Sequence, residues 1–235
     1  MHIPDGFLDP KMSAGMMGAA AFVLAYCVAK VKAAVTALAP QAALAAAGRG
    51  VGNVVSGMRR VLTGDGERTI YKMGMVASLV FAGQMFNFPI SSGTSGHLIG
   101  GVFASVLLGP FAGAIVIAVV LAVQMLFFAD GGLLAIGANI VNMALSGTII
   151  AYYIYYFLKK AAPEWLAIIV AAWSSVVLAA STCSLEIGFS GTSAFTQVIP
   201  AMLNVHVIIG LAEALISLAA IYLFRTMIRG EEPAE

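Results

Sequence analysis

Apolar segments of membrane-spanning length recur along the whole chain. A window of about twenty residues finds such segments at 13–34, 70–88, 97–109, 111–128, 133–158, 164–184 and 200–226. The third is short, and Gly109-Pro110 separates it from the fourth, so these two form either a tight hairpin or a helix broken at mid-depth. The pattern predicts a bundle of about seven transmembrane helices.

Composition supports the same class of protein. Of the 235 residues, 61% are hydrophobic and 10% are charged, and the mean hydropathy is +0.98. These values lie outside the range of soluble globular domains, so we expect an all-α integral membrane protein with a single membrane domain over residues 1–235. Cys27 and Cys183 fall in apolar segments and are expected to be buried thiols rather than a disulfide.

Basic residues gather on one side of the expected bundle when seven helices are counted from an external N-terminus. Only Lys11 falls on the other side. Because membrane proteins concentrate positive residues on the cytoplasmic side, the N-terminus is predicted to lie outside and the C-terminus in the cytoplasm. The residues on the cytoplasmic side are Lys30, Lys32, Arg49, Arg59, Arg60, Arg68, Lys72, Lys159, Lys160, Arg225 and Arg229.

One polar connection is longer than the others. Residues 35–69 contain an alanine run that Pro40 and several glycines interrupt, and the segment is too short to span a membrane. We expect a basic cytoplasmic insertion with an interfacial helix from about 51 to 62. The alternative is a plain surface loop over the same residues.

The chain opens with turn-forming residues rather than with a signal peptide. The stretch "MHIPDGFLDP" has no basic start and no small-residue cleavage site. Its proline, aspartate and glycine residues delay the first helix until about Ser13. We therefore expect a retained terminus. Histidine is too large a second residue for the usual removal of the initiator methionine, so Met1 is expected to keep its free α-amine.

A retained Met-His terminus can chelate a metal ion. The α-amine of Met1, the backbone nitrogen of His2 and the Nδ1 atom of His2 can close fused five- and six-membered rings on one ion. Such a set is nearly planar and requires a deprotonated amide, which suits Ni(II) or Cu(II). One planar position remains open, and the other two histidines, His97 and His206, are the candidates for it.

The two histidines stand in different surroundings. His97 lies in "SSGTSGHLIGG", where the glycines favour a backbone brought close to a ligand, and a structural turn residue is the alternative. His206 precedes Glu213 by seven residues, so both share one helix face. Ionisable residues inside spanning segments indicate function because they are costly in lipid. A helix-to-helix hydrogen bond is the alternative role for His206.

Four ordered motifs give the chain a family resemblance. The motifs "MHIPDGFL", "FPISSGTSGHLIGG", "LFFADGGLLAIGANIVNMALSG" and "HVIIGLAEALIS" resemble the substrate-binding membrane component of energy-coupling-factor transporters for nickel and cobalt. The likeness extends from Met1 to about Arg225. It implies a seven-helix bundle in a prokaryotic inner membrane, with an N-terminal loop, residues 1–12, that folds back into the centre and holds one metal ion. The 35–69 insertion is longer than this family's pattern.

The resemblance also implies a ligand set. The ligands would be the α-amine of Met1, the amide nitrogen and imidazole of His2, and the imidazole of His97. For Asp130 and Asn139, helix capping is the alternative role. The residues expected to support the ligands or lock the loop are Asp5, Ser95, Asp130, Asn139, Asn142, His206 and Glu213.

The implied function is capture of Ni²⁺ or Co²⁺ outside the cell as transported substrate, with no organic cofactor and no nucleic-acid partner. The implied partners are a transmembrane coupling subunit, two cytosolic ATPase subunits and a small accessory membrane subunit. The chain has no G-x-x-x-x-G-K-[ST] motif, so ATP hydrolysis is assigned to other chains. Small residues at helical spacing, Ala14, Gly18, Ala21 and Ala25, serve either internal packing or contact with a partner helix.

Ligand chemistry favours nickel, because Ni(II) accepts a planar field of nitrogens and a deprotonated amide more readily than Co(II). Cobalt uptake for cobalamin synthesis is the alternative. A membrane metalloenzyme is a remote alternative, since a planar site of four nitrogens lacks the open coordination position that catalysis requires.

Overall fold

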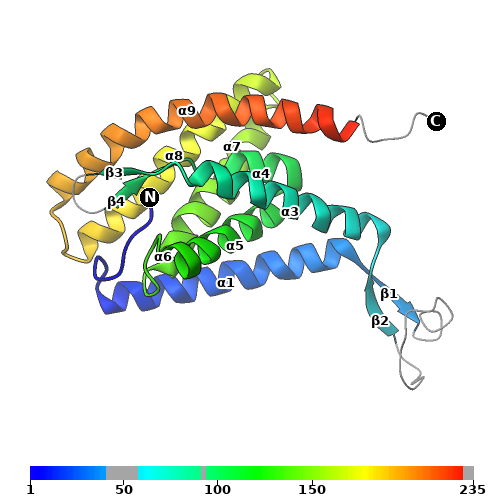
Figure 1. Cartoon of the computed structure of the whole chain (residues 1–235), viewed down its shortest axis with the longest axis horizontal. Helices are drawn as coiled ribbons and strands as arrows, with labels where there is room; N and C mark the ends of the chain where they lie inside the picture. The colour runs from blue at the N-terminus through cyan, green and yellow to red at the C-terminus, as the bar shows by residue number, and fades with distance from the viewer. Residues whose placement is uncertain (41–57, 91–93, 230–235) are drawn as a thin grey trace.

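Seven helical segments run through the described parts of the chain, residues 1–40, 58–90 and 94–229, in the computed structural model. In Figure 1, α1, α3 and α9 lie along the length of the molecule, with α4 and α5 between them. The segments are α1 (Pro10–Val35), α3 (Gly64–Gln84), α4 (Gly101–Leu108), α5 (Pro110–Phe128), the continuous run of α6 (Ile136–Ile140), η1 (Val141–Ile150) and α7 (Ala151–Leu158), α8 (Glu164–Phe189) and α9 (Phe195–Arg229).

The expected seven helices are confirmed, and five of the described ones are long and apolar enough to cross a membrane. The other two, α3 and α4, fall outside that class for different reasons. The first turn of α3 is polar, with Asp65 and Glu67, and α4 has only 8 residues. A hydropathy window therefore finds these helices less clearly than the others.

Helix α1 begins earlier than the sequence pattern predicts. The carboxylate of Asp9 accepts hydrogen bonds from the backbone N–H groups of Lys11, at 2.8 Å, and Met12, at 3.2 Å. Pro10 occupies the first turn, where its missing N–H costs nothing. The aspartate cap and the proline together start the helix at residue 10 rather than at Ser13.

Helix α3 also begins earlier, inside the expected insertion. The Thr63 hydroxyl accepts a hydrogen bond from Gly66 N–H at 2.9 Å, which caps the helix. The acidic residues of the first turn complement the helix dipole. The polar connection after α1 therefore covers residues 36–63 rather than 35–69.

Two short strands extend the ends of α1 and α3. Strand β1 (Thr36–Pro40) pairs antiparallel with β2 (Met58–Leu62), and both lie at the end of the bundle away from the N-terminus (Figure 1). The expected interfacial helix over 51–62 is wrong for residues 58–62, because the backbone groups leaving one helix pair with those entering the next. The remainder of that expected helix, residues 51–57, lies outside the described residues.

The break at Gly109-Pro110 is a tight hairpin. Gly109 has φ 84° and ψ 163°, and the chain returns so closely that a Cβ atom on Gly113 would lie 2.9 Å from the Ser105 Cα atom. The alternative of a helix broken at mid-depth is wrong. Helix α4 starts only after Gly100, which has φ 71°, so His97 lies in the connection before the helix rather than within the expected helix 97–109.

Small residues set the distance between the central helices. Ala171, Ser175 and Ala179 on α8 are all buried, and the Ser175 hydroxyl donates to the carbonyl of Gly147 in η1 at 2.6 Å. Cys183 on the same helix and Cys27 on α1 are buried free thiols, as expected.

The small-residue stripe of α1 does not pack inside the bundle. Ala14, Gly18, Ala21 and Ala25 are all exposed, and α1 lies at the edge of the molecule (Figure 1). Internal packing is therefore the wrong interpretation of this stripe.

The contact between α4 and η1 yields a stability prediction. A Cβ atom on Gly101 would lie 2.2 Å from the carbonyl oxygen of Gly147, so Gly101→Ala must push the two helices apart. We expect a loss of about 1–3 kcal/mol in the free energy of unfolding, measured by thermal unfolding in detergent. Gly74→Ala in α3 is the matched control, because nothing lies within 4 Å of its added Cβ, and it is expected to be neutral or stabilising by up to about 1 kcal/mol. Equal melting temperatures for the two variants would contradict this packing argument.

Candidate metal centre

The N-terminal segment folds back into the bundle. Met1 and Ile3 have no exposed surface, and His2 is 4% exposed. Asn139 of α6 binds both backbone groups of Ile3. Its Oδ1 atom accepts from Ile3 N–H at 2.8 Å, and its Nδ2 atom donates to the Ile3 carbonyl at 3.2 Å. The side-chain amide of Asn139 thus makes the pair of backbone hydrogen bonds that a neighbouring strand would make, and it fixes the segment in the interior.

The connection between α5 and α6 forms the cradle for this segment. The Asp5 carboxylate accepts from the backbone N–H groups of Leu133, at 3.0 Å, and Leu134, at 2.7 Å. Gly132 donates its N–H to the Ile3 carbonyl at 2.9 Å, and a Cβ atom on Gly132 would lie 2.2 Å from Asp5 Oδ1. The close approach of the two backbones explains Gly132 of the "DGGLLAIGAN" motif, while Gly131 has a left-handed φ of 98°.

Two backbone nitrogens of the segment converge on Ser95. The Met1 α-amine donates to the Ser95 carbonyl oxygen and, at 3.1 Å, to the Ser95 hydroxyl. The His2 N–H also points to that hydroxyl, at 3.3 Å. Ser95 belongs to β4 (Thr94–Gly96), which pairs with β3 (Phe88–Ile90) ahead of the His97 connection. Both nitrogens of the predicted chelate backbone therefore face one point.

The imidazoles of His2 and His97 lie against each other beside that point. Their ring centroids are 4.5 Å apart, with an interplanar angle of 23°. His97 Nδ1 is 2.6 Å from the Leu98 carbonyl and donates to it. His97 Nε2 is buried and has no hydrogen-bond partner among the described residues. The neutral tautomer that this bond selects leaves a lone pair on Nε2.

The His2 ring is oriented differently from the predicted chelate. Its Nδ1 atom is 2.9 Å from Asp130 Oδ1, and its Nε2 atom has no hydrogen-bond partner in the described part of the chain. In the chelate, Nδ1 must instead face the same ion as the amine and amide nitrogens. Asp130 thus competes for the nitrogen that the chelate uses.

Burial makes these nitrogen donors neutral. It lowers the pKa of the Met1 α-amine from 8.0 to about 5, because the charged form loses its water. Burial likewise lowers the pKa of His2 from its ordinary 6.5. Burial, the largest single effect on Asp130, raises the pKa of its carboxyl, but the hydrogen bonds from His2 and Asn87 and the positive charge of His2 and of the Met1 amine together hold that pKa below its ordinary 3.8. At neutral pH the donors carry lone pairs and Asp130 is a carboxylate.

The structure brings most of the expected supporting residues to this region. Ser95, Asp130 and Asn139 contact the N-terminal segment through the bonds given above, and Asp5 within the segment binds the connection between α5 and α6. The capping role is wrong for Asp130 and Asn139, because Ala135 stands at the N-cap of α6 and no side chain caps that helix.

The remaining three supporting residues lie further from the terminus. Glu213 accepts hydrogen bonds from the connection that carries His97. His206 is fully buried in α9 and donates from Nδ1 to the Met202 carbonyl at 2.7 Å. Asn142 binds Glu186 at 2.7 Å rather than the N-terminal segment or His97.

Sequence reasoning missed three buried polar residues near these connections. Gln124 of α5 interacts with His2, and neither atom of its side-chain amide has a geometrically well-formed hydrogen bond in the described structure. Gln84 of α3 binds the backbone of Ile99, and Glu186 of α8 pairs with Asn142. The signal was available for Gln84 and Gln124, since each is a polar residue within an expected apolar segment, whereas Glu186 lies just beyond the expected segment 164–184.

No three His, Cys, Asp or Glu side chains of the described residues form a group that could hold a metal ion. The donors that gather near Ser95 are instead a chain terminus, a backbone amide and two imidazoles.

The model of one protein family, described as the cobalt uptake substrate-specific transmembrane region, matches residues 34–229. The chain belongs to this family. It is 34% identical over 219 residues to a putative fused nickel transport protein of Archaeoglobus fulgidus, a match that covers 92% of this chain and 63% of that protein. It is 31% identical over 161 residues to a cobalt transport protein of Sorangium cellulosum, which covers 65% of this chain and 72% of that protein. The chain thus spans less than two thirds of the fused relative's length.

Solved structures share the fold. The crystal structure of a truncated transition metal transporter aligns with a TM-score of 0.77 and 27% identity, covering 97% of this chain and 99% of that one. The biotin S-component of an ECF-type ABC transporter aligns with a TM-score of 0.57 and 15% identity over 71% of this chain and 95% of that one, which shows a related fold alone. The resemblance drawn from the motifs, and the expectation of a multi-pass transport component rather than an enzyme, are confirmed.

The role of Asn139 in this family member can be tested. Asn139→Ala removes the acceptor of the buried Ile3 N–H, so we expect a loss of about 1–3 kcal/mol in stability. We also expect faster hydrogen exchange at the Ile3 amide. Asn87→Ala is the control, since Asn87 is exposed and its bond to Asp130 is 3.3 Å long. Unchanged protection of the Ile3 amide in Asn139→Ala would show that other contacts hold the segment.

Proposed function

We propose that this chain captures a divalent transition-metal ion, with nickel the favoured one, and delivers it for ATP-driven uptake as a substrate-specificity subunit. The observation that carries the proposal is the convergence of the Met1 amine and the His2 amide on Ser95, beside the stacked His2 and His97 rings. A buried group of neutral nitrogens suits a late first-row metal ion rather than Mg²⁺ or Ca²⁺, which prefer oxygen.

The proposed ligands are the Met1 α-amine, the deprotonated amide and Nδ1 of His2, and His97. The Nε2 atom of His97 is the fourth donor, because its lone pair has no partner among the described residues while Nδ1 is bound to Leu98. Metal capture then requires the His2 ring to leave Asp130 and turn Nδ1 toward the amine. The Ser95 hydroxyl, which both backbone nitrogens now contact, gives way to the ion.

The remaining expected residues support this set. Asp5 and Asn139 hold the N-terminal loop against the bundle, and residues 1–12 act as the metal-binding loop. Asn142 and His206 have more distant roles, since their hydrogen bonds go to Glu186 and Met202.

The proposed orientation places the N-terminus outside the cell. The cytoplasmic side in this proposal holds the C-terminal ends of α1, α7 and α9, together with strands β1 and β2. Lys32, Lys159 and Arg225 lie at these helix ends, as the positive-inside rule requires. The proposed partners are a transmembrane coupling subunit, two ATPases and a small accessory membrane subunit. The exposed stripe of Ala14 and Gly18 on α1 permits a partner helix to approach closely.

The first test is a metal titration. We expect native protein to bind about one Ni²⁺ per chain, since one set of four donors is proposed. One residue added before Met1, or His97→Ala, should weaken binding more than the roughly 10- to 100-fold typical of supporting residues. Isothermal titration and metal analysis give the affinities, and a residue added after Glu235 is the matched control. If the N-terminally extended protein binds as tightly as the native one, the α-amine is not a ligand.

The second test concerns metal identity. A planar nitrogen field with a deprotonated amide should favour Ni²⁺ over Co²⁺ by about tenfold or more. Competition between the two ions on one protein sample measures this ratio. The nickel complex should also be yellow and diamagnetic. Equal or tighter cobalt binding would instead favour cobalt uptake for cobalamin synthesis, the second candidate, which the similarity to a cobalt transport protein supports.

A further inference from the structure

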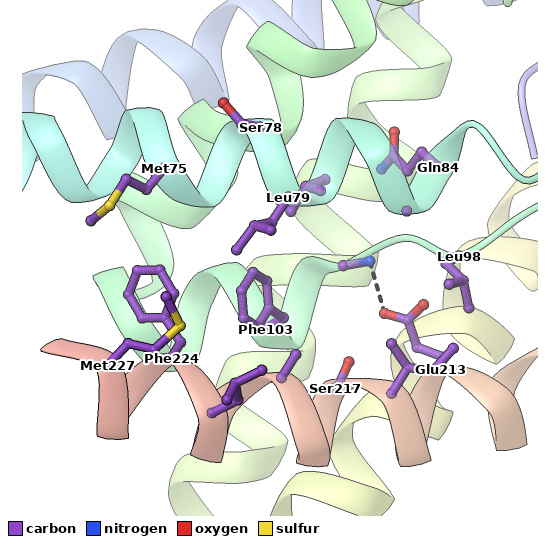
Figure 2. Close-up of a pocket in the computed structure, with 16 residues that line it drawn as sticks. Met75, Ser78, Leu79, Gln84, Leu98, Phe103, Glu213, Ser217, Phe224 and Met227 are labelled. Atoms are coloured by element: carbon purple, nitrogen blue, oxygen red, sulfur yellow. Dashed lines mark hydrogen bonds between the residues drawn. The ribbon is translucent and has the colours of Figure 1, made fainter.

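The connection that carries His97 is held from two sides by buried side chains. Ile99 N–H donates to Glu213 Oε2 at 2.9 Å, and Gly100 N–H donates to Glu213 Oε1 at 2.8 Å. The Ile99 carbonyl accepts from Gln84 Nε2 at 2.7 Å. Figure 2 shows Gln84 on α3 and Glu213 on α9 on either side of this connection. Both polar groups of Ile99 are thus bound by side chains from different helices.

These bonds lie in the interior of the protein. Glu213 is 1% exposed and Gln84 is fully buried. A carboxylate that accepts two backbone N–H groups makes strong hydrogen bonds, and low polarity around it strengthens them further. Gly100 has φ 71°, and a Cβ atom there would lie 2.9 Å from the Val80 side chain. The left-handed backbone of Gly100 therefore permits the turn that presents the N–H groups of Ile99 and Gly100 to the Glu213 carboxylate.

The connection borders a cavity on one side. A cavity of about 600 Å³ lies between α3, α4 and α9 and reaches Gln84, Leu98 and Glu213. Most of its other lining residues are apolar, including Leu79 and Phe103, and Ser78 and Ser217 are polar (Figure 2). Where the connection borders the cavity, the three hydrogen bonds hold it in place, together with the packing of Val80 against Gly100.

The same backbone carries His97. The His97 ring donates from Nδ1 to the Leu98 carbonyl at 2.6 Å, so the imidazole is tied to the residue just before Ile99. A shift of Ile99 moves Leu98, and with it the ring that stacks on His2. A planar metal site tolerates little displacement of its fourth donor.

We propose that Glu213 and Gln84 are positioning residues that set the place of the His97 imidazole through the backbone of Ile99 and Gly100. The inference rests on the proposed function, because His97 matters in this way only as a metal ligand. Neither side chain touches the metal in this arrangement. Both act through the connection, and α3 and α9 thereby determine the geometry of the site.

The test compares Glu213→Gln with native protein by Ni²⁺ titration and visible absorption. The substitution replaces one acceptor oxygen by an NH₂ group that faces a backbone N–H. We expect Ni²⁺ affinity to fall about 10- to 100-fold, and the absorption band of bound nickel to shift as His97 moves. Glu164→Gln is the matched control, because Glu164 accepts from Tyr155 and Arg225 and does not contact the His97 connection. It should leave affinity and spectrum unchanged.

A second variant keeps the proposal testable if Glu213→Gln fails to fold. Gln84→Met removes the donor to the Ile99 carbonyl at similar volume and should weaken Ni²⁺ binding and shift the spectrum in the same direction. In the double variant the two losses should be less than multiplicative, because both act on one peptide unit.

The outcomes separate the two proposals. If the native protein binds nickel and the folded variants match it in affinity and spectrum, the positioning role is overturned and the proposed function stands. Lower thermal stability with an unchanged nickel spectrum and affinity also overturns it, since the role is then only structural. Native protein that binds no nickel or cobalt contradicts the proposed function itself.

Discussion

Burial of the amino terminus is the constraint on which the rest of the site depends. An amine and successive backbone groups placed in an apolar interior cost several kcal/mol when unpaired, so each requires a partner there. Ser95 accepts from the Met1 amine and the His2 N–H, and Asn139 binds both backbone groups of Ile3. Because Ser95 lies in β4 and Asn139 in α6, satisfying the terminus also fixes these two elements relative to one another.

The site is built on connections, yet helices determine its geometry. The N-terminal segment is held by Asn139 of α6, and the His97 connection by Gln84 of α3 and Glu213 of α9. Helices spaced by contacts such as Gly101 against Gly147 are rigid supports. A nitrogen set without a rigid support would lose the precision that planar coordination needs.

Exclusion of water serves the proposed chemistry as well as the fold. Burial keeps the α-amine neutral, since its pKa falls to about 5, and a neutral amine is a ligand without first losing a proton. Asp130 retains its negative charge at the edge of the site, where its side chain is 27% exposed. In the proposed function, docking of the terminus and formation of the metal site are one event, so metal binding is coupled to local folding.

The sequence by itself determined the membrane class and the seven helices, and it supplied the candidate residues for metal binding. Bilayer thickness imposes long apolar runs, and ligand chemistry restricts the donors to a few residue types. Tertiary structure decided that α4 and α5 form a hairpin, that residues 58–62 pair as a strand, and which polar group binds which. Met1 and Ser95 are 94 positions apart, and Ile3 and Asn139 are 136 apart. Such pairings depend on how helices pack in three dimensions, which a hydropathy pattern does not encode.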